Sequence, residues 1–190
     1  MVAIRAILIT FLLAFALALV MLTPLAQAQS PSLSGPAVLT VAGNVSKTNR
    51  GPVDPFVDAF FHFGEVEFDK AAAFDLSRLQ ALGLKKVTVR YPDWPRAFTL
   101  EGPLLSDVLD AAGASGSVVR VQALDGYAAE IPMEEVRDYP ILLAVKRDGQ
   151  FLGLGDRGPA WVIFPRDDYP ELAERDEAQW VWSAYYIDVE

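Results

Sequence analysis

The chain has 190 residues, no cysteine and a formal net charge of −9, with 25 acidic against 16 basic side chains. The lack of cysteine excludes disulfide bonds, thiolate metal ligands and a cysteine nucleophile. The negative charge disfavours nucleic acid and anionic membrane surfaces as partners, because both repel an acidic protein at long range. Hydrophobic residues make up 52% of the sequence, so packing alone can stabilise a sizeable core.

The first 28 residues have the pattern of a secretory signal peptide. Arg5 precedes a long apolar run, and Ala-Gln-Ala at 26–28 provides the small residues of a cleavage site. The apolar run is near the lower length of a membrane span, so an uncleaved anchor is the alternative. Pro24 and the motif after it favour cleavage after Ala28. We therefore expect an exported, periplasmic protein with a mature chain of 162 residues and a net charge of −10.

The mature chain is predicted to start with a flexible leader and to continue as one domain. Residues 29–37 are polar, contain proline and show no periodicity. Residues 38–190 contain no internal repeat or low-complexity tract, and their number fits a single domain. "VLTVAGNV" predicts the first strand, whereas the following segment, 46–64, is rich in turn residues and aromatics and too irregular to assign.

Two helices are expected on either side of a strand. "FDLSRLQALG" has apolar residues at helical spacing, with Asp75 as the N-cap and Gly83 after the last turn. "KKVTVRY" predicts a strand. "GPLLSDVLDAAGA" then predicts a second helix, with Pro103 in its first turn and Gly113 at its end.

The second half of the chain is typical of antiparallel sheet. "SVVRVQALDGYAAEIP" predicts a hairpin with Asp125-Gly126 as a two-residue turn, and "ILLAVKRDGQFLGL" predicts another around Asp148-Gly149. "AWVIFP" predicts a short buried strand, and the acidic "RDDYPELAERDEAQ" predicts one or two helical turns. "WVWSAYYIDVE" predicts a last strand, whose alternation places on one face Trp180, Trp182, Ala184, Tyr186 and Asp188. The fold class is therefore α+β and sheet-rich.

Residues typical of catalysis are scarce. His62 is the single histidine, so a Ser-His-Asp triad would need it, and its aromatic neighbours are more typical of packing or of a pocket wall. The acids between 167 and 177 match no EF-hand spacing, and a solvated surface explains them better than a metal site. We predict no catalytic residue and no metal ligand.

Arginines and flat aromatics gather at predicted strand ends and in the adjoining loops. Stacking faces beside arginine and carboxylate groups are what a planar heterocycle with hydrogen-bonding edges requires. The spacing supports equally well the alternative that Trp161 and Tyr127 are core residues and that the arginines are surface residues. The residues concerned are Arg90, Arg96, Arg147, Arg157, Arg166, Tyr91, Trp94, Tyr127 and Trp161.

An ordered set of segments carries a family resemblance. "FTLEGPLLSDVLDAAGA", "VQALDGYAAEIP", "YPILLAVKRDGQFLGLGDRGPAWVIFP" and a terminal W-x-W-x-x-x-x-I-x-V together resemble the oxidoreductase molybdopterin-binding domain, the fold of sulfite oxidase, over roughly residues 38 to 190. The resemblance implies a sheet-rich α+β fold with mostly antiparallel or mixed strands and a few short helices.

Enzymes of this family hold molybdenum through the pterin dithiolene and one protein cysteine, at the end of the strand that here reads "VTVRY". Arg90 and Tyr91 stand at about that point in this chain, so the resemblance implies a site without the thiolate ligand, and molybdenum is not expected. The acidic chain also lacks the dense basic cluster that would hold the phosphate of molybdopterin.

Small exported proteins of this type are linked to binding of free pterins and to control of membrane-bound cyclic-di-GMP enzymes through their periplasmic domains. The resemblance thus implies a non-catalytic pterin-binding protein that signals to a membrane partner. A pterin presents two N–H donors beside a carbonyl, which one carboxylate, one arginine and one stacking ring can satisfy. The candidate residues are Trp94 and Tyr127 for stacking, Arg90 and Arg157 for the carbonyl and ring nitrogens, Asp125 or Asp156 for the donor edge, and Tyr91 and Trp161 beside them.

Two other functions remain open on the sequence. One is a molybdopterin oxidoreductase without the cysteine ligand. The other is an interaction module that binds no small ligand and docks a partner through its aromatic terminus, "WVWSAYY". Asp125 also has a purely structural explanation, because an Asp-Gly turn favours aspartate whether or not a ligand binds.

Overall fold

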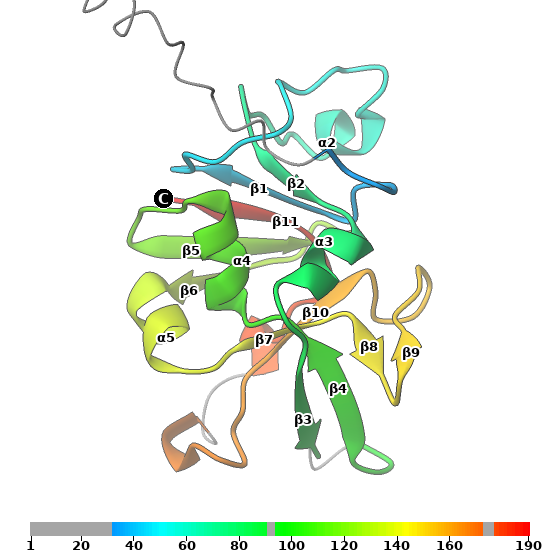
Figure 1. The fold of residues 1–190 in the computed structure, drawn as a ribbon, viewed down its shortest axis with the longest axis vertical. Helices are drawn as coiled ribbons and strands as arrows, with labels where there is room; N and C mark the ends of the chain where they lie inside the picture. The colour runs from blue at the N-terminus through cyan, green and yellow to red at the C-terminus, as the bar shows by residue number, and fades with distance from the viewer. Residues whose placement is uncertain (1–31, 91–93, 173–176) are drawn as a thin grey trace, which may run out of the picture.

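The computed structural model describes residues 32–90, 94–172 and 177–190. Within these ranges the chain forms two sheets of mixed and antiparallel strands with four short α-helices (Figure 1). The predicted sheet-rich α+β class is confirmed. The predicted signal peptide, its cleavage site after Ala28 and Tyr91 lie outside the described residues.

The larger sheet is mixed. Its strand order is β2-β1-β11-β10-β7, and β5 pairs with both β11 and β6. β1 runs parallel to β11, while the other pairs of this sheet are antiparallel. The last strand of the chain is therefore central, with β1 on one side and β5 on the other. The strands are β1 Leu39–Gly43, β2 Ala72–Phe74, β5 Val118–Ala123, β6 Ala128–Pro132, β7 Leu142–Ala144, β10 Ala160–Ile163 and β11 Trp182–Val189.

The smaller sheet has the order β3-β4-β8-β9 and is antiparallel. Figure 1 shows β3 and β4 at one end of the long axis of the molecule. The predicted turn at Asp148-Gly149 is confirmed, since both residues have positive φ, 49° and 81°, as a two-residue type I′ hairpin requires. The strands are β3 Lys85–Val89, β4 Phe98–Gly102, β8 Lys146–Arg147 and β9 Gln150–Phe151.

The described helices are short, and no helix among the described residues is long and apolar enough to cross a bilayer. Asp75 caps α3 as predicted, because its carboxylate accepts the backbone N–H of Arg78 at 2.8 Å. Gly113 closes α4 as predicted, as the C-cap residue with a φ of 63°. The helices are α2 Ala59–Phe63, α3 Leu76–Ala81, α4 Leu105–Ala112 and α5 Met133–Asp138, and the 3-10 helices are η1 Pro170–Leu172 and η2 Glu177–Gln179.

The predicted place of Pro103 in the first turn of α4 is wrong. The helix begins at Leu105, and Leu104 is its extended N-cap residue. The carbonyl of Pro103 accepts the N–H of Leu143 at 2.9 Å, so tertiary pairing with β7 keeps this residue outside the helix. The buried face of α4 then packs on the core, and Figure 1 shows the helix in front of β5 and β11.

The turn at Asp125-Gly126 differs from the predicted two-residue turn. Ala123 N–H donates to the carbonyl of Tyr127 at 2.8 Å, Gly126 N–H donates to that of Ala123 at 3.0 Å, and Gly126 has φ of 88°. This is a three-residue loop in which a type I turn precedes a left-handed glycine. The N–H of Leu124 donates to the carbonyl of Ser183 in β11 at 3.0 Å, and this hydrogen bond accounts for the wider loop.

Part of the segment predicted as a leader contacts α3. The N–H groups of Ser34 and Gly35 donate to one oxygen of Asp75 at 2.6 and 2.8 Å. Asp75 is only 3% exposed, and its other oxygen accepts the Ser77 hydroxyl as well as the N–H of Arg78. These hydrogen bonds, the largest contribution coming from Arg78 N–H, hold the pKa of Asp75 well below its usual range.

Candidate functional site

A pocket with a volume of about 370 Å³ opens where the β5–β6 turn, η2 and the start of β11 meet. We call it the tryptophan pocket. Its size is in the range of small-molecule sites, and its wall combines aromatic rings, small apolar side chains and one carboxylate. The lining residues are Ala123, Asp125, Tyr127, Ala178, Trp180, Val181 and Trp182.

Hydrogen bonds between distant parts of the chain hold the pocket wall together. The Tyr127 hydroxyl donates to the carbonyl of Ala178 at 2.8 Å and so joins the β5–β6 turn to η2. The side-chain amide of Gln179 donates to the carbonyl of Glu130 at 3.0 Å, which joins η2 to β6. The turn and η2 are thus fixed relative to each other before any ligand binds.

Asp125 is exposed and supplies the carboxylate of the pocket. Its Oδ1 accepts the N–H of Tyr127 at 3.0 Å, which is the structural role expected in a turn of this sequence. A carboxylate has two oxygens with several acceptor positions, so one backbone hydrogen bond does not saturate it. Asp125 can therefore accept hydrogen bonds from a ligand while it stabilises the turn.

Trp182 forms another wall and is 45% exposed, although it begins a central strand. The next residue, Ser183, has a positive φ of 55°, and its N–H donates to the carbonyl of Arg157 at 2.9 Å. Because of this irregularity, the predicted alternation of side chains at the start of the last strand is wrong. Trp180 precedes the strand and is buried, and Ser183 interrupts the extended backbone between the exposed Trp182 and the buried Ala184, so these three residues do not share the predicted face.

A row of aromatic rings in contact with one another and with a guanidinium group adjoins the pocket. The guanidinium of Arg157 lies 4.5 Å from the ring centroid of Trp161 and 5.9 Å from that of Trp182. The ring of Trp94 lies 5.2 Å from that of Trp161 and 5.5 Å from that of Phe98. Three of the predicted site residues, Trp94, Arg157 and Trp161, are therefore in one continuous cluster, which we call the aromatic row.

Trp161 is a core residue within this row. It is 3% exposed, and its indole N–H donates to the carbonyl of Trp180 at 3.2 Å. The structure therefore supports the alternative that Trp161 is a core residue. Tyr127 is 45% exposed and lines the pocket, so the same alternative fails there.

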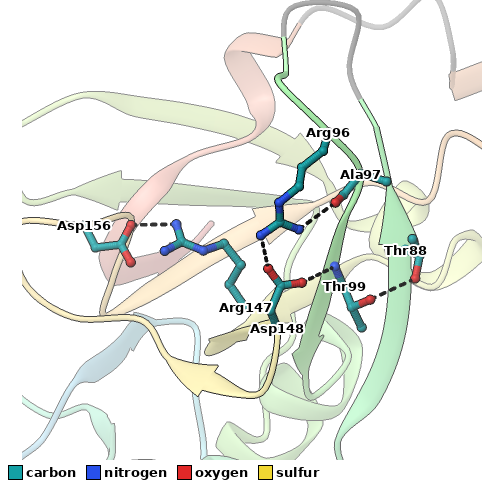
Figure 2. A network of polar contacts seen from close by, with 7 residues as sticks. All are labelled: Thr88, Arg96, Ala97, Thr99, Arg147, Asp148 and Asp156. Carbon is teal, nitrogen blue, oxygen red and sulfur yellow. Dashed lines mark hydrogen bonds and ion pairs between the residues drawn. The ribbon is translucent and has the colours of Figure 1, made fainter.

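Figure 2 shows the polar network on the smaller sheet, next to the aromatic row. Arg96 donates to the carboxylate of Asp148 at 2.7 Å, and Asp148 also accepts the N–H of Thr99 at 3.1 Å. The hydrogen bond from Arg96, followed by that from Thr99, lowers the pKa of Asp148. The guanidinium of Arg96 also lies 4.1 Å from the ring centroid of Phe98, so it extends the row.

Two predicted site residues are placed elsewhere. Asp156 forms an ion pair with Arg147 at 2.9 Å, which Figure 2 shows, and its carboxylate does not line the tryptophan pocket. Arg90 follows β3 and is exposed, and it too lies outside the pocket wall. The structure thus brings Asp125 and Tyr127 into the pocket and leaves Asp156 and Arg90 out of it.

The sequence interpretation missed the contribution of Trp180 and Trp182 to a pocket. The signal was the W-x-W spacing at the start of the last strand, which we assigned to a strand face or a docking surface. The pocket arises because Ser183 departs from extended geometry and η2 folds back onto β6, and neither feature leaves a clear mark in the sequence.

The donor set does not fit a molybdenum ion held by a protein thiolate, because the chain contains no cysteine and Arg90 stands near the point where the resemblance places that ligand. Among the described residues there is also no group of three or more histidine or acidic side chains arranged to hold a metal ion.

No family model matches the sequence, and no curated protein matches it. Among solved structures, the sulfane dehydrogenase SoxCD from Paracoccus pantotrophus is similar, with a TM-score of 0.55 and 16% sequence identity over 84% of this chain. The chain spans 40% of the length of that protein's chain. At this level of identity the likeness is one of fold alone.

Proposed function

We propose that this protein is a non-catalytic, periplasmic pterin-binding protein that signals ligand occupancy to a membrane partner, such as an enzyme that metabolises cyclic-di-GMP. The single observation that carries the proposal is the tryptophan pocket, where a half-exposed tryptophan, a tyrosine and an exposed carboxylate surround about 370 Å³. The family resemblance adds the class of ligand.

The chemistry of the wall matches the groups that a pterin presents. Trp182 and Tyr127 offer ring faces or edges for a flat bicyclic ligand. Asp125 is the acceptor for the two neighbouring N–H donors of the aminopyrimidinone edge. Arg157 is not part of the pocket wall, but its guanidinium lies 5.9 Å from the centroid of the Trp182 ring, and in this proposal one of its N–H groups donates to the ligand carbonyl.

The first test is the identity of any small molecule that co-purifies. We expect protein isolated from its native compartment to release a fluorescent compound whose mass is that of a pterin. Protein that releases none and shows no affinity for pterins in titration contradicts the proposal.

A second candidate function is an oxidoreductase without the cysteine ligand. The fold likeness to a sulfane dehydrogenase favours it, while the donor set opposes it. This function predicts molybdenum in protein purified from its native compartment. Elemental analysis that finds no molybdenum in pterin-loaded protein removes this candidate and leaves the first.

The interaction module with an exposed aromatic terminus has less support. β11 is a central strand, and its residues from Ser183 to Ile187 are buried. Trp182 is the exposed aromatic residue of this strand, and it faces the tryptophan pocket. A surface for a partner has to be sought elsewhere on the molecule.

A further inference from the structure

Four of the exposed large apolar side chains of the described residues lie in α2 and in the turn before it. Phe56 is 92% exposed, Val57 77%, Phe60 54% and Phe63 82%. We call these four residues the α2 surface. Isolated exposed apolar residues are common, but four within eight positions form a patch of the kind that marks interaction sites. Figure 1 shows α2 at the end of the molecule opposite β3 and β4.

The α2 surface stands on a well-packed base. On the inner side of α2, the Phe61 ring lies 5.3 Å from that of Tyr185 and 5.6 Å from that of Phe68. Arg50 forms an ion pair with Asp58, and its guanidinium lies 5.0 Å from the ring centroid of Phe61. The exposed rings are therefore presented by a segment that the fold holds in place.

A groove with a volume of about 470 Å³ separates α2 from the β5–β6 turn. Phe60 and Phe63 line one side, and Leu124, Asp125 and Gly126 line the other. Asp125 also lines the tryptophan pocket, so a single turn borders both the candidate ligand site and the groove beside the α2 surface.

The charge around this surface limits what can cover it. Residues 51–69 contain no lysine or arginine and five carboxylates, those of Asp54, Asp58, Glu65, Glu67 and Asp69. Arg50 neutralises Asp58, whereas the other four acidic residues are exposed. A second copy of this chain would bring the same acids against them, and an anionic bilayer would repel them as well.

We propose that the α2 surface is the docking site for a protein partner that presents an amphipathic segment with apolar anchors and flanking lysine or arginine residues. The exposed phenylalanines and the groove receive the anchors, and the exposed carboxylates of residues 51–69 pair with the basic residues. This inference rests on the signalling half of the proposed function and is independent of which ligand fills the pocket.

The test uses designed peptides as probes. A helical peptide about 18 residues long carries leucines on one face and lysines on the other, and its counterpart carries glutamates in place of the lysines. We expect calorimetry to detect binding of the lysine peptide alone. We expect Phe56→Ser with Phe63→Ser to weaken it about tenfold or more, the effect typical of an interface hot spot. Glu65→Lys with Glu67→Lys should shift the preference toward the glutamate peptide.

Matched controls separate docking from general attraction to an acidic protein. Phe151→Ser removes an exposed phenylalanine on β9, and Glu134→Lys reverses an exposed charge on α5. We expect both variants to bind the lysine peptide like the unmodified protein. All variants should bind pterin with unchanged affinity, so a failure of docking and a failure of ligand binding are seen separately.

Four outcomes overturn the inference. They are no binding of the lysine peptide, equal loss in the control variants, concentration-dependent dimers that Phe56→Ser with Phe63→Ser abolishes, and sedimentation with phosphatidylcholine–phosphatidylglycerol vesicles that the same pair abolishes. The last two assign the surface to a second copy and to the membrane, respectively.

Discussion

Trp182 is the side chain on which the ligand hypothesis depends most, because its half-exposed ring lines the tryptophan pocket and also contacts Arg157. Stacking of a heterocycle on an aromatic side chain contributes about 1–3 kcal/mol. We therefore expect Trp182→Ala to weaken pterin binding by about 5- to 150-fold in a fluorescence titration.

Phe151→Ala is the control for that substitution. Phe151 is also 45% exposed, but it lies on β9 and packs against Lys146 rather than against the pocket. Equal losses of affinity in the two variants would show that Trp182 does not contact the ligand.

Asp75 determines how part of the stability depends on pH. Its folded-state pKa is lowered, so its ionised form stabilises the native state above the unfolded pKa of about 3.9, and this contribution is lost as the pH falls toward the folded value. Asn also caps helices well, so Asp75→Asn removes mainly the charge. We expect urea unfolding to find this variant less stable at neutral pH, with a difference that shrinks in acid. A difference independent of pH would contradict this explanation.

At the scale of single residues, the sequence identified positions better than roles. Asp75 was predicted as a cap, and Trp94, Arg157 and Trp161 were predicted near one another, because caps and strand ends have local signatures. The ion pair between Arg147 and Asp156 was not predictable from the sequence. It joins a strand to a loop nine positions later, and only the three-dimensional fold brings the two side chains together.

Among the elements, the β5–β6 turn links the fold to the proposed ligand site most directly. Gly126 has a φ of 88°, and no atom lies within 4 Å of a Cβ added there, so Gly126→Ala acts through backbone strain of about 1 kcal/mol. Relief of this strain displaces Asp125 and Tyr127. We expect the variant to lose pterin affinity as well as stability, as measured by titration and urea unfolding.

Gly149 provides a matched control, because its φ of 81° and open surroundings are nearly the same in the other hairpin. Gly149→Ala should cost a similar stability and leave pterin affinity unchanged. If both variants lose affinity alike, the effect is global and the turn has no special role.

The two hairpins also show how far elements can be read from sequence. Both have an Asp-Gly pair, but β8–β9 forms the predicted two-residue turn, whereas the other loop has three residues because Leu124 bonds to Ser183. Likewise β11 was predicted, but its irregularity at Ser183 was not. Local propensity specifies the element, and contacts with distant strands decide its register.

For the whole molecule, we predict that ligand binding and partner binding are coupled, because Asp125 lines both the tryptophan pocket and the groove beside the α2 surface. If a ligand in the tryptophan pocket shifts the β5–β6 turn, it alters the groove beside the α2 surface. We expect saturating pterin to change the affinity for the lysine peptide by about fivefold or more, and the peptide to change pterin affinity by the same factor. Identical peptide affinities with and without pterin would contradict this coupling.

The overall architecture was predictable because the hydrophobic pattern and the family resemblance agree on a sheet-rich α+β fold. The α2 surface was not, since 46–64 has no periodic pattern and its helix is held by Arg50 and by Tyr185, far along the chain. The tryptophan pocket and the α2 surface thus lie where tertiary contacts, rather than local sequence, determine the structure.

The most direct test of the central claim is a titration that compares pterin with lumazine, in which a carbonyl replaces the 2-amino group. A site that donates and accepts hydrogen bonds at that edge rejects an analogue without the donor. We expect pterin to bind more tightly than lumazine, and Asp125→Asn to remove most of the difference. Equal affinities for the two compounds, or an unchanged preference in Asp125→Asn, would contradict the assignment of the tryptophan pocket as a pterin site.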